Sequence, residues 1–199
     1  MLPALMSLMI FSTSSILGWF QVSGFRFQVS GFNNLKLLNL KLETNLYFCH
    51  MQKLNFPAYS FRLKNSENKV AIFDEIRKKF IILTPEEWVR QHVVQYLILD
   101  KKYAKSYINV EKLIKVNDLS KRYDVVVFQP NGELFLLVEC KAPEVKITQQ
   151  TFDQIARYNL TLKAQYLMVT NGHNHYFCQM DFEQEKYTFL SELPDFQTK

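Results

Sequence analysis

The sequence predicts an α/β (α+β) domain over residues 51–199, with a mixed central sheet flanked by helices. Three observations support this fold class. A run with helix-start signals begins at residue 84, an apolar run at 106–116 and two β-branched apolar runs on either side of a turn follow it, and a second helical run separates these from two further apolar runs. The order is therefore helix, three strands, helix, two strands, which suits a mixed sheet with helices packed on it.

The first helix is predicted over residues 85–99. Thr84 can serve as the N-cap, and Pro85 occupies the first helical position, where its missing N–H costs nothing. Glu87 follows the cap by three residues, so a capping box accounts for this side chain without any role in a site. A strand over residues 106–116 comes next.

A β-hairpin follows this strand. Residues 122–128 and 133–141 are apolar, β-branched runs, and the turn between them contains Pro130 followed by Asn131 and Gly132. Proline with Asn-Gly between two such runs is a strong hairpin signal. The two runs should therefore pair as antiparallel strands.

The hairpin brings polar side chains together. With the turn centred near Pro130 and Asn131, Asp124 lies opposite Leu137, and Glu139 becomes its diagonal neighbour on the same face, roughly 7 Å away. Side chains alternate along a strand, so Glu139 and Lys141 share a face while the intervening cysteine points to the other. A slip of one residue would destroy this arrangement.

Two carboxylates this close in apolar strands are unfavourable unless a cation neutralises them. Mg²⁺ takes oxygen ligands and is usually bound by one or two carboxylates together with waters and phosphate oxygens. A lysine beside the ion can activate water and stabilise charge on the phosphorus oxygens, as in phosphodiester hydrolysis. The alternative is a structural ion pair between Asp124 and Lys141, with Glu139 as a strand-end charge.

A second helix is predicted over about residues 149–162. Gln154 and Tyr158 lie one turn apart and share a helix face. They could contact a phosphate or water, or they could simply face solvent. Strands at residues 164–170 and 175–181 then flank an Asn-Gly turn, the first of them joining the sheet through the helical crossover.

These motifs resemble the PD-(D/E)xK nuclease superfamily, and specifically the nuclease domain at the N-terminus of the R subunit of type I restriction enzymes. The resemblance covers about residues 51–196. The family pattern is an acidic residue on the first helix, an Asp in one strand, Glu-x-Lys in the next and Gln-x-x-x-Tyr on the following helix. In this chain the matching residues are Glu87, Asp124, Glu139, Lys141, Gln154 and Tyr158. Tyr123 stands where the family usually has proline, which makes the match less specific.

The resemblance implies a restriction-endonuclease-like core and a Mg²⁺-dependent DNA endonuclease. It implies that Asp124 and Glu139 hold the metal, with Glu87 as a further ligand and Glu86 as its alternative. Lys141 would activate water or stabilise the transition state, while Gln154 positions the phosphate and Tyr158 supports the site. DNA is then the expected partner, together with restriction-modification subunits.

Two other function classes fit the same residues. One is a nucleic-acid-binding or partner-binding module that keeps the fold without turnover, since fold does not fix function. The other is an RNA or DNA-repair nuclease. None of the five glycines precedes Lys-Ser or Lys-Thr, so the sequence contains no phosphate loop and encodes no ATP-driven translocase.

Composition sets further limits. A net charge of +5 permits a nucleic-acid partner without requiring one. The candidate phosphate contacts are Arg77, Lys78, Lys79, Lys101, Lys102, Lys105, Lys121 and Arg122. Three cysteines without zinc-type spacing argue against a disulfide framework or a zinc site and fit a reducing cytoplasm.

Residues 1–50 form a different kind of sequence. Residues 1–20 are apolar and uncharged, and FQVSGF occurs at 20–25 and again at 27–32. A signal peptide would need an earlier basic stretch, and a membrane helix would need about twenty apolar residues. The third interpretation is a non-domain extension from a mis-assigned start, with the true start near Met51. We expect this region to be poorly packed and not to act as a membrane anchor.

Overall fold

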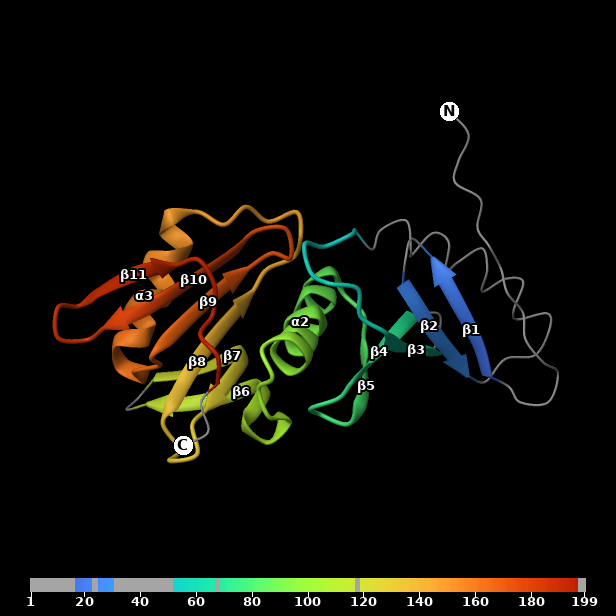
Figure 1. Ribbon diagram of the computed structural model, residues 1–199, viewed down its shortest axis with the longest axis horizontal. Coiled ribbons are helices and arrows are strands. Elements are labelled where there is room, and N and C mark those ends of the chain that lie inside the picture. Colours follow the sequence, from blue (N-terminus) through green and yellow to red (C-terminus); the bar gives the residue numbers. More distant parts are fainter. Residues whose placement is uncertain (1–16, 23–24, 31–51, 67–68, 117–118, 197–199) are drawn as a thin grey trace. The chain divides into compact units, whose positions relative to one another are not determined.

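The computed structural model describes residues 17–22, 25–30, 52–66, 69–116 and 119–196 (Figure 1). The chain divides into two compact units, residues 1–53 with 57–84 and residues 54–56 with 85–199. The sequence placed a single domain at 51–199, whereas the units divide after residue 84. The interpretation of residues 1–50 as an extension from a mis-assigned start stays a prediction.

The first unit contains a five-stranded sheet in the order β1-β2-β3-β4-β5. Its strands are β1 (Leu17–Val22), β2 (Phe25–Ser30), β3 (Phe61–Ser66), β4 (Lys69–Asp74) and β5 (Lys79–Ile82). All neighbours are antiparallel except β2 and β3. β1 and β2 are thus paired strands within the segment expected to pack poorly, and the remainder of residues 1–50 lies outside the described residues.

The second unit confirms the predicted mixed α/β fold class. Its helical elements are α2 (Pro85–Gln95), a π-helical turn η1 (Tyr96–Asp100), a 3-10 turn η2 (Lys105–Tyr107) and α3 (Gln149–Leu162). Its strands are β6 (Ile108–Val116), β7 (Leu119–Phe128), β8 (Leu134–Cys140), β9 (Tyr166–Thr170), β10 (His175–Asp181) and β11 (Lys186–Leu190). The edge strand β11 was not predicted.

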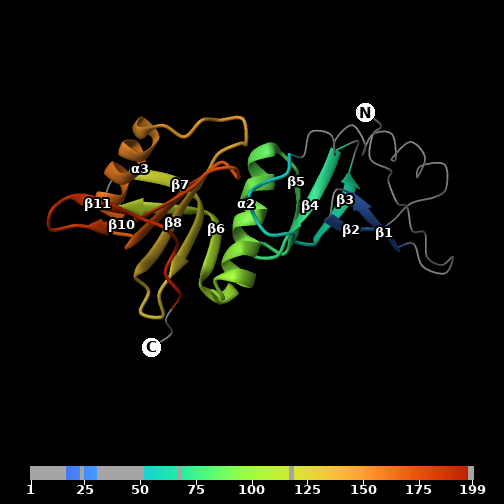
Figure 2. The ribbon, with the colours of Figure 1, turned by 45° about the horizontal axis from the view of Figure 1, so that its top comes forward.

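These six strands form a sheet in the order β11-β10-β9-β8-β7-β6. β8 and β9 run parallel, and α3 makes the crossover between them, as the sequence predicted. Val125, Val126 and Val127 are all fully buried, so both faces of β7 are covered. Figures 1 and 2 show α2 and α3 on either side of this sheet. On the α3 side, Phe152 and Ile155 pack in the core.

The register of the β7–β8 hairpin differs by two residues from the prediction. Val126 pairs with Leu137, where the expected register would have placed Asp124. One residue of this shift comes from Gly132, whose φ of 87° is in the left-handed region and whose N–H closes the turn onto the Gln129 carbonyl. The second comes from a bulge: Phe128 pairs with Leu134 and Val127 with Leu136, so Phe135 is the extra residue.

Residues 54–56 belong to the second unit and pack on the turn between β9 and β10. The Asn55 N–H donates to the Gly172 carbonyl at 2.7 Å, and the Asn55 side-chain amide donates to the His173 carbonyl at 2.6 Å. His175 Nε2 donates to the Asn55 carbonyl at 2.8 Å. Leu54 is buried beside Gly172. This three-residue segment, here called the strap, is therefore fixed to the β9–β10 turn.

His92 predicts a pH-dependent stability. Burial lowers the pKa of this α2 histidine from 6.5 to about 4, so the folded protein binds fewer protons there than the unfolded chain does. The contribution of neutral His92 to stability is complete above about pH 6.5, declines as the pH falls, and is lost below about pH 4. At about 1.4 kcal/mol per pKa unit, the loss amounts to about 3 kcal/mol.

The check is urea unfolding of the wild type and His92→Gln between pH 7.5 and pH 4. The wild type should lose more stability than the variant across this interval, because only the wild type must protonate His92 on unfolding. Parallel curves for the two proteins would contradict the assignment.

No helix within residues 17–22, 25–30, 52–66, 69–116 and 119–196 is long and apolar enough to cross a membrane.

Candidate active site

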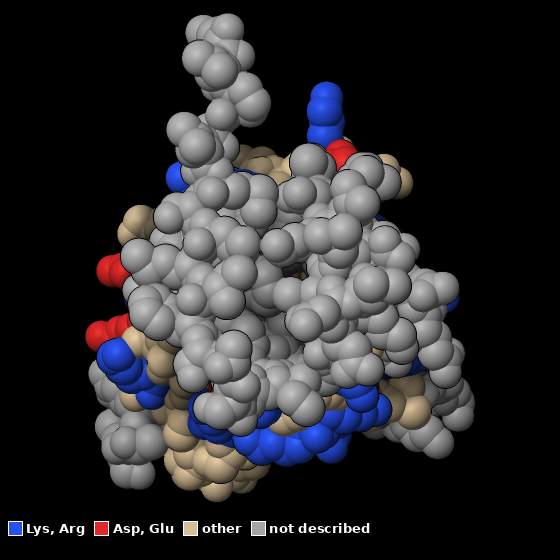
Figure 3. All heavy atoms as spheres, turned by 90° about the vertical axis from the view of Figure 1, so that its right-hand side faces the viewer, with Lys and Arg blue, Asp and Glu red and all other residues tan. Residues whose placement is uncertain are grey.

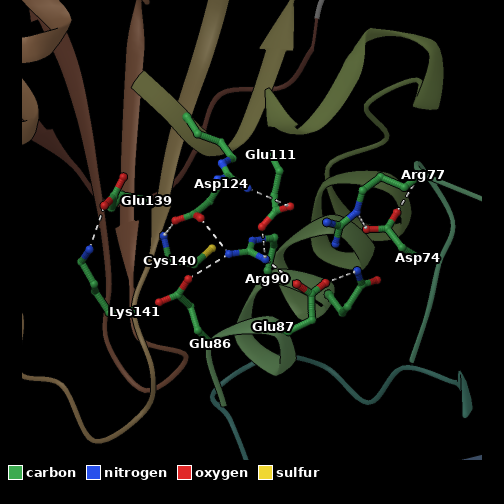
Figure 4. Close-up of polar contacts among 12 residues, drawn as sticks. Asp74, Arg77, Glu86, Glu87, Arg90, Glu111, Asp124, Glu139, Cys140 and Lys141 are labelled. Carbon is green, nitrogen blue, oxygen red and sulfur yellow. Dashed lines mark hydrogen bonds and ion pairs between the residues drawn. The ribbon is translucent and has the colours of Figure 1, made fainter. Parts of the chain in front are cut away.

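The ends of β7 and β8 carry the predicted strand residues. Val125 pairs with Val138, and continuing this register by one residue brings Asp124 level with Glu139. Asp124 Oδ2 accepts a hydrogen bond from the Cys140 N–H at 2.7 Å. The Lys141 ammonium lies 2.7 Å from Glu139 Oε1, on the left of Figure 4. The ion pair at the strand end thus joins Lys141 to Glu139 and not to Asp124.

Helix α2 contributes a buried arginine to the same region. The Arg90 side chain is 5% exposed, and its Nη2 donates to Asp124 Oδ1 at 2.8 Å. The same guanidinium bonds to further carboxylates, which surround it in Figure 4: Glu86 at 2.9 Å, Glu111 at 3.4 Å and Glu87. Arg90 therefore links the first helix to the strand that carries Asp124.

The two acidic residues at the start of α2 lie in different environments. Glu87 is buried and accepts hydrogen bonds from Arg90 and from the Gln91 side-chain amide. The Glu86 side chain is 46% exposed. The structure therefore joins Glu87 to Asp124 through Arg90, while Glu86 keeps part of its carboxylate open to solvent.

The electrostatics favour a cation near Asp124. Burial, together with the charge of Glu139, raises the pKa of Asp124 to about 6, although the charge of Arg90 and the hydrogen bonds from Arg90 and the Cys140 N–H oppose the shift. For Lys141, burial acts to lower the pKa, but the bond to Glu139 and the charges of Glu139 and Asp124 raise it above its usual value. Lys141 is consequently an ammonium at neutral pH, and Asp124 is a largely buried carboxylate whose positive partner is Arg90.

Asp124 and Glu139 are the side chains at this position that could contribute oxygen ligands to a divalent cation such as Mg²⁺. Among the described residues no three His, Cys, Asp or Glu side chains are grouped to hold an ion. Two carboxylates on adjacent strand ends are the usual protein contribution to a Mg²⁺ site, because this ion keeps several waters. Asp124 and Glu139 supply such a pair, and their side chains remain 16% and 15% exposed.

The two predicted α3 residues are placed differently. Tyr158 is 36% exposed. It lies close enough to Tyr123, the residue before Asp124, to help burial and Glu139 raise the pKa of Tyr123 to about 12. Gln154 is exposed, and within the described residues no hydrogen bond joins it to the other candidate residues. The structure thus brings Tyr158 toward the site and leaves Gln154 on the surface of α3.

Arg90 was missed by the sequence reasoning. The available signal was its spacing of three and four residues from Glu87 and Glu86, which is typical of ion pairs along a helix. Such pairs are usually solvated and of little consequence. The contact with Asp124 on β7 is what distinguishes Arg90 from an arginine in an ordinary ion pair on a helix surface.

Some of the basic residues predicted to contact phosphate have carboxylate partners. Arg77 pairs with buried Asp74 at 2.7 Å, and Lys101 lies 2.9 Å from Glu192. The Arg122 side chain is 65% exposed, 3.9 Å from Glu111. On the face drawn in Figure 3, lysine and arginine side chains gather along the lower edge. Of the three residues, exposed Arg122 is best placed to meet a phosphate near Asp124.

Fold and site together define a class: a mixed-sheet α/β domain with an Asp on one strand and Glu-x-Lys at the end of the next. Residues 85–194, more than half of the chain, match the family of the type I restriction enzyme R protein N terminus. The chain belongs to this family, which confirms the resemblance noted in the sequence.

The chain was also compared with solved structures and with curated proteins. It is similar to a fragment of a protein assigned as the HsdR subunit of a type I restriction enzyme from Vibrio vulnificus YJ016, with 20% sequence identity and a TM-score of 0.32. The match covers 44% of this chain and 19% of that one, so this chain spans less than two thirds of its relative. No curated protein matches.

Proposed function

We propose that the second unit is a Mg²⁺-dependent DNA endonuclease domain that hydrolyses phosphodiester bonds. The observation that carries this proposal is the arrangement of Asp124, Glu139 and Lys141 at the ends of adjacent strands. Membership in the R protein N-terminal family supports a restriction-like nuclease module. The proposal includes restriction-modification subunits as partners and the cytoplasm as the location, and it includes no translocase.

Each residue has a role that follows from its position. Asp124 and Glu139 would hold the ion between β7 and β8. Bound there, Mg²⁺ supplies Lewis-acid polarisation of a phosphate and a lower pKa for water. The Lys141 ammonium, fixed by Glu139 at 2.7 Å, would orient the attacking water and donate to the phosphorus oxygens as negative charge builds on them.

The α3 residues would act at the edge of the site. Gln154 is exposed and has a side-chain amide that can donate to a phosphate oxygen on bound DNA. Tyr158 would support the site by packing near Tyr123, next to Asp124. Glu87 would act through its bond to Arg90.

A second candidate function is a nucleic-acid-binding or partner-binding module without turnover. One observation favours it: Arg90 already gives Asp124 a positive partner at 2.8 Å. Because Asp124 is already paired with the Arg90 guanidinium, the carboxylate could stay ionised in the folded protein without a bound metal ion. An RNA or DNA-repair nuclease would use the same residues on a different substrate.

The test is cleavage of supercoiled plasmid by the full chain in Mg²⁺, with and without excess chelator. We expect nicked or linear product in Mg²⁺, no product with chelator, and recovery when Mg²⁺ is restored, because phosphate charge and water activation both need the ion. Parallel incubations with single-stranded DNA and RNA identify the preferred substrate.

Two outcomes would contradict the proposal. Cleavage that persists in chelator would remove the metal from the mechanism. Salt-dependent DNA binding that ignores Mg²⁺ and gives no product would favour the binding module instead.

A further inference from the structure

Arg90 is the side chain at the site whose role the proposed function leaves unassigned. Its Nη2 lies 2.8 Å from Asp124 Oδ1 and 2.9 Å from Glu86 Oε1. Its Nη1 bonds to Glu87. Hydrogen bonds between a guanidinium and carboxylates are charge-assisted, and the rigid planar fork of arginine gives them a fixed geometry. The buried guanidinium therefore cannot turn without breaking bonds to charged groups.

We propose that Arg90 is the positioning residue for Asp124, fixing the orientation of the carboxylate that would hold the divalent cation. This inference rests on the proposed function. Asp124 Oδ1 is held by Arg90 at 2.8 Å, and Oδ2 is held by the Cys140 N–H at 2.7 Å. Both oxygens are thus oriented before an ion arrives, and a ligand that is already ordered gains affinity because binding need not order it.

Arg90 is itself held in place from its own helix. Glu86 and Glu87 precede it by four and three residues, so all three side chains lie within one turn of α2. Glu87 is 3% exposed, and its second oxygen accepts from Gln91 at 2.8 Å. The chain of contacts runs from Gln91 through Glu87 and Arg90 to Asp124, which lies 34 residues further along the sequence.

The positive charge of Arg90 has an opposing effect, because it repels a metal ion. The Arg90 guanidinium faces the carboxylates of Glu86, Glu87, Glu111 and Asp124, and Arg122 lies 3.9 Å from Glu111, so four negative charges meet two positive ones and two remain in excess. The cluster therefore still attracts a cation. We infer that orientation of Asp124, and not repulsion, is the dominant effect of Arg90.

Arg90→Lys separates orientation from charge. Lysine keeps the positive charge and loses the planar fork that bonds to Asp124 and the α2 carboxylates together. The probe is Mn²⁺ alone, titrated into the full chain by calorimetry without DNA. We expect about tenfold weaker Mn²⁺ binding in Arg90→Lys, as for the loss of other groups that orient metal ligands. The Mg²⁺ concentration for half-maximal cleavage should rise in parallel, with the rate at saturating Mg²⁺ nearly unchanged.

A second variant guards against a folding defect. Removing Arg90 alone would leave the buried Glu87 carboxylate without its cation, so Arg90→Met is combined with Glu87→Gln. This double variant should also bind Mn²⁺ weakly. Wild-type affinity in Arg90→Lys, or tighter binding in the double variant, would overturn the role of Arg90.

Asp124→Asn distinguishes failure of the proposed function from failure of the role of Arg90 alone. If the wild type binds Mn²⁺ no better than Asp124→Asn does, the proposed function fails and the role of Arg90 fails with it. If Asp124→Asn loses the binding and Arg90→Lys keeps it, only the role of Arg90 is refuted.

Discussion

Lys141→Ala is expected to reduce Mg²⁺-dependent plasmid cleavage by about 100-fold or more, the usual cost of losing a group that moves a proton or stabilises transition-state charge. The Lys141 ammonium lies 2.7 Å from Glu139, and its pKa is raised, so it is charged at neutral pH. Because its side chain is 32% exposed, the protein should remain folded without it. The measurement is the initial rate of nicking at saturating Mg²⁺.

The matched control for this variant is Lys186→Ala. Lys186 lies on β11, three strands away from β8 in the sheet, and its ammonium hydrogen-bonds to Gln184. This change removes a lysine and its hydrogen bond to a neutral amide away from the site, so cleavage should continue at the wild-type rate. Undiminished cleavage in Lys141→Ala would remove the lysine from the mechanism and with it the main support for a nuclease.

Gly172→Ala is expected to destabilise the protein by about 3 kcal/mol, from left-handed backbone strain of about 1–2 kcal/mol and an overpacking cost of similar size. Gly172 has a φ of 84°. A Cβ built there would lie 2.6 Å from Leu54 Cδ2, and Leu54 is 2% exposed, so it has little room to withdraw. The measurement is the free energy of unfolding in urea.

Gly132→Ala is the control that isolates the backbone strain. Gly132 has a φ of 87°, and a Cβ there would meet nothing within 4 Å. Its cost should be about 1–2 kcal/mol, the strain alone. In a Leu54→Ala background, the cost of Gly172→Ala should fall to that of Gly132→Ala, because the strap side chain no longer blocks the added carbon. Equal costs for the two glycine variants in the wild-type background would contradict close packing of the strap against Gly172.

Local signals in the sequence were sufficient for the order of elements in the second unit. The Thr84–Pro85 start preceded α2, the turn at Pro130 joined β7 to β8, and α3 covers residues 149–162 as predicted. β11 was missed because its residues, KYTFL, lack a long apolar run and lie at the sheet edge, where burial does not impose strict alternation.

The hairpin register could not be predicted, since it depended on two local irregularities. The turn signal was read correctly, but neither the extra residue at Gly132 nor the bulge at Phe135 has a distinct signature in one sequence. Phe135 packs against Tyr103, Tyr166 and Phe196, which are distant in the chain. Tertiary packing of this aromatic residue, and not a local preference, accompanies the bulge.

For the candidate site, the sequence could predict which side chains of one strand lie together, because spacing along a strand determines the face. Glu139 and Lys141 were expected together, and the structure pairs them. The central role of Arg90 was not predictable, because contact with Asp124 requires knowing how α2 packs on the sheet. Gln154 was assigned from its spacing to Tyr158, and spacing alone does not determine how far a helix surface lies from a strand end.

The two irregularities of the β7–β8 hairpin have a consequence for how this sequence can vary. Each displaces β8 by one residue, and together they move it by a full pleat, so the face that each side chain presents is preserved while its position along β7 changes. A single insertion or deletion that shifted the register of β8 would turn Glu139 and Lys141 toward the opposite side of the sheet. A residue added or removed between Val127 and Leu136 is therefore compatible with the site only where the turn or a bulge absorbs it, as at Gly132 and Phe135, so length variation in this hairpin should be confined to those two points.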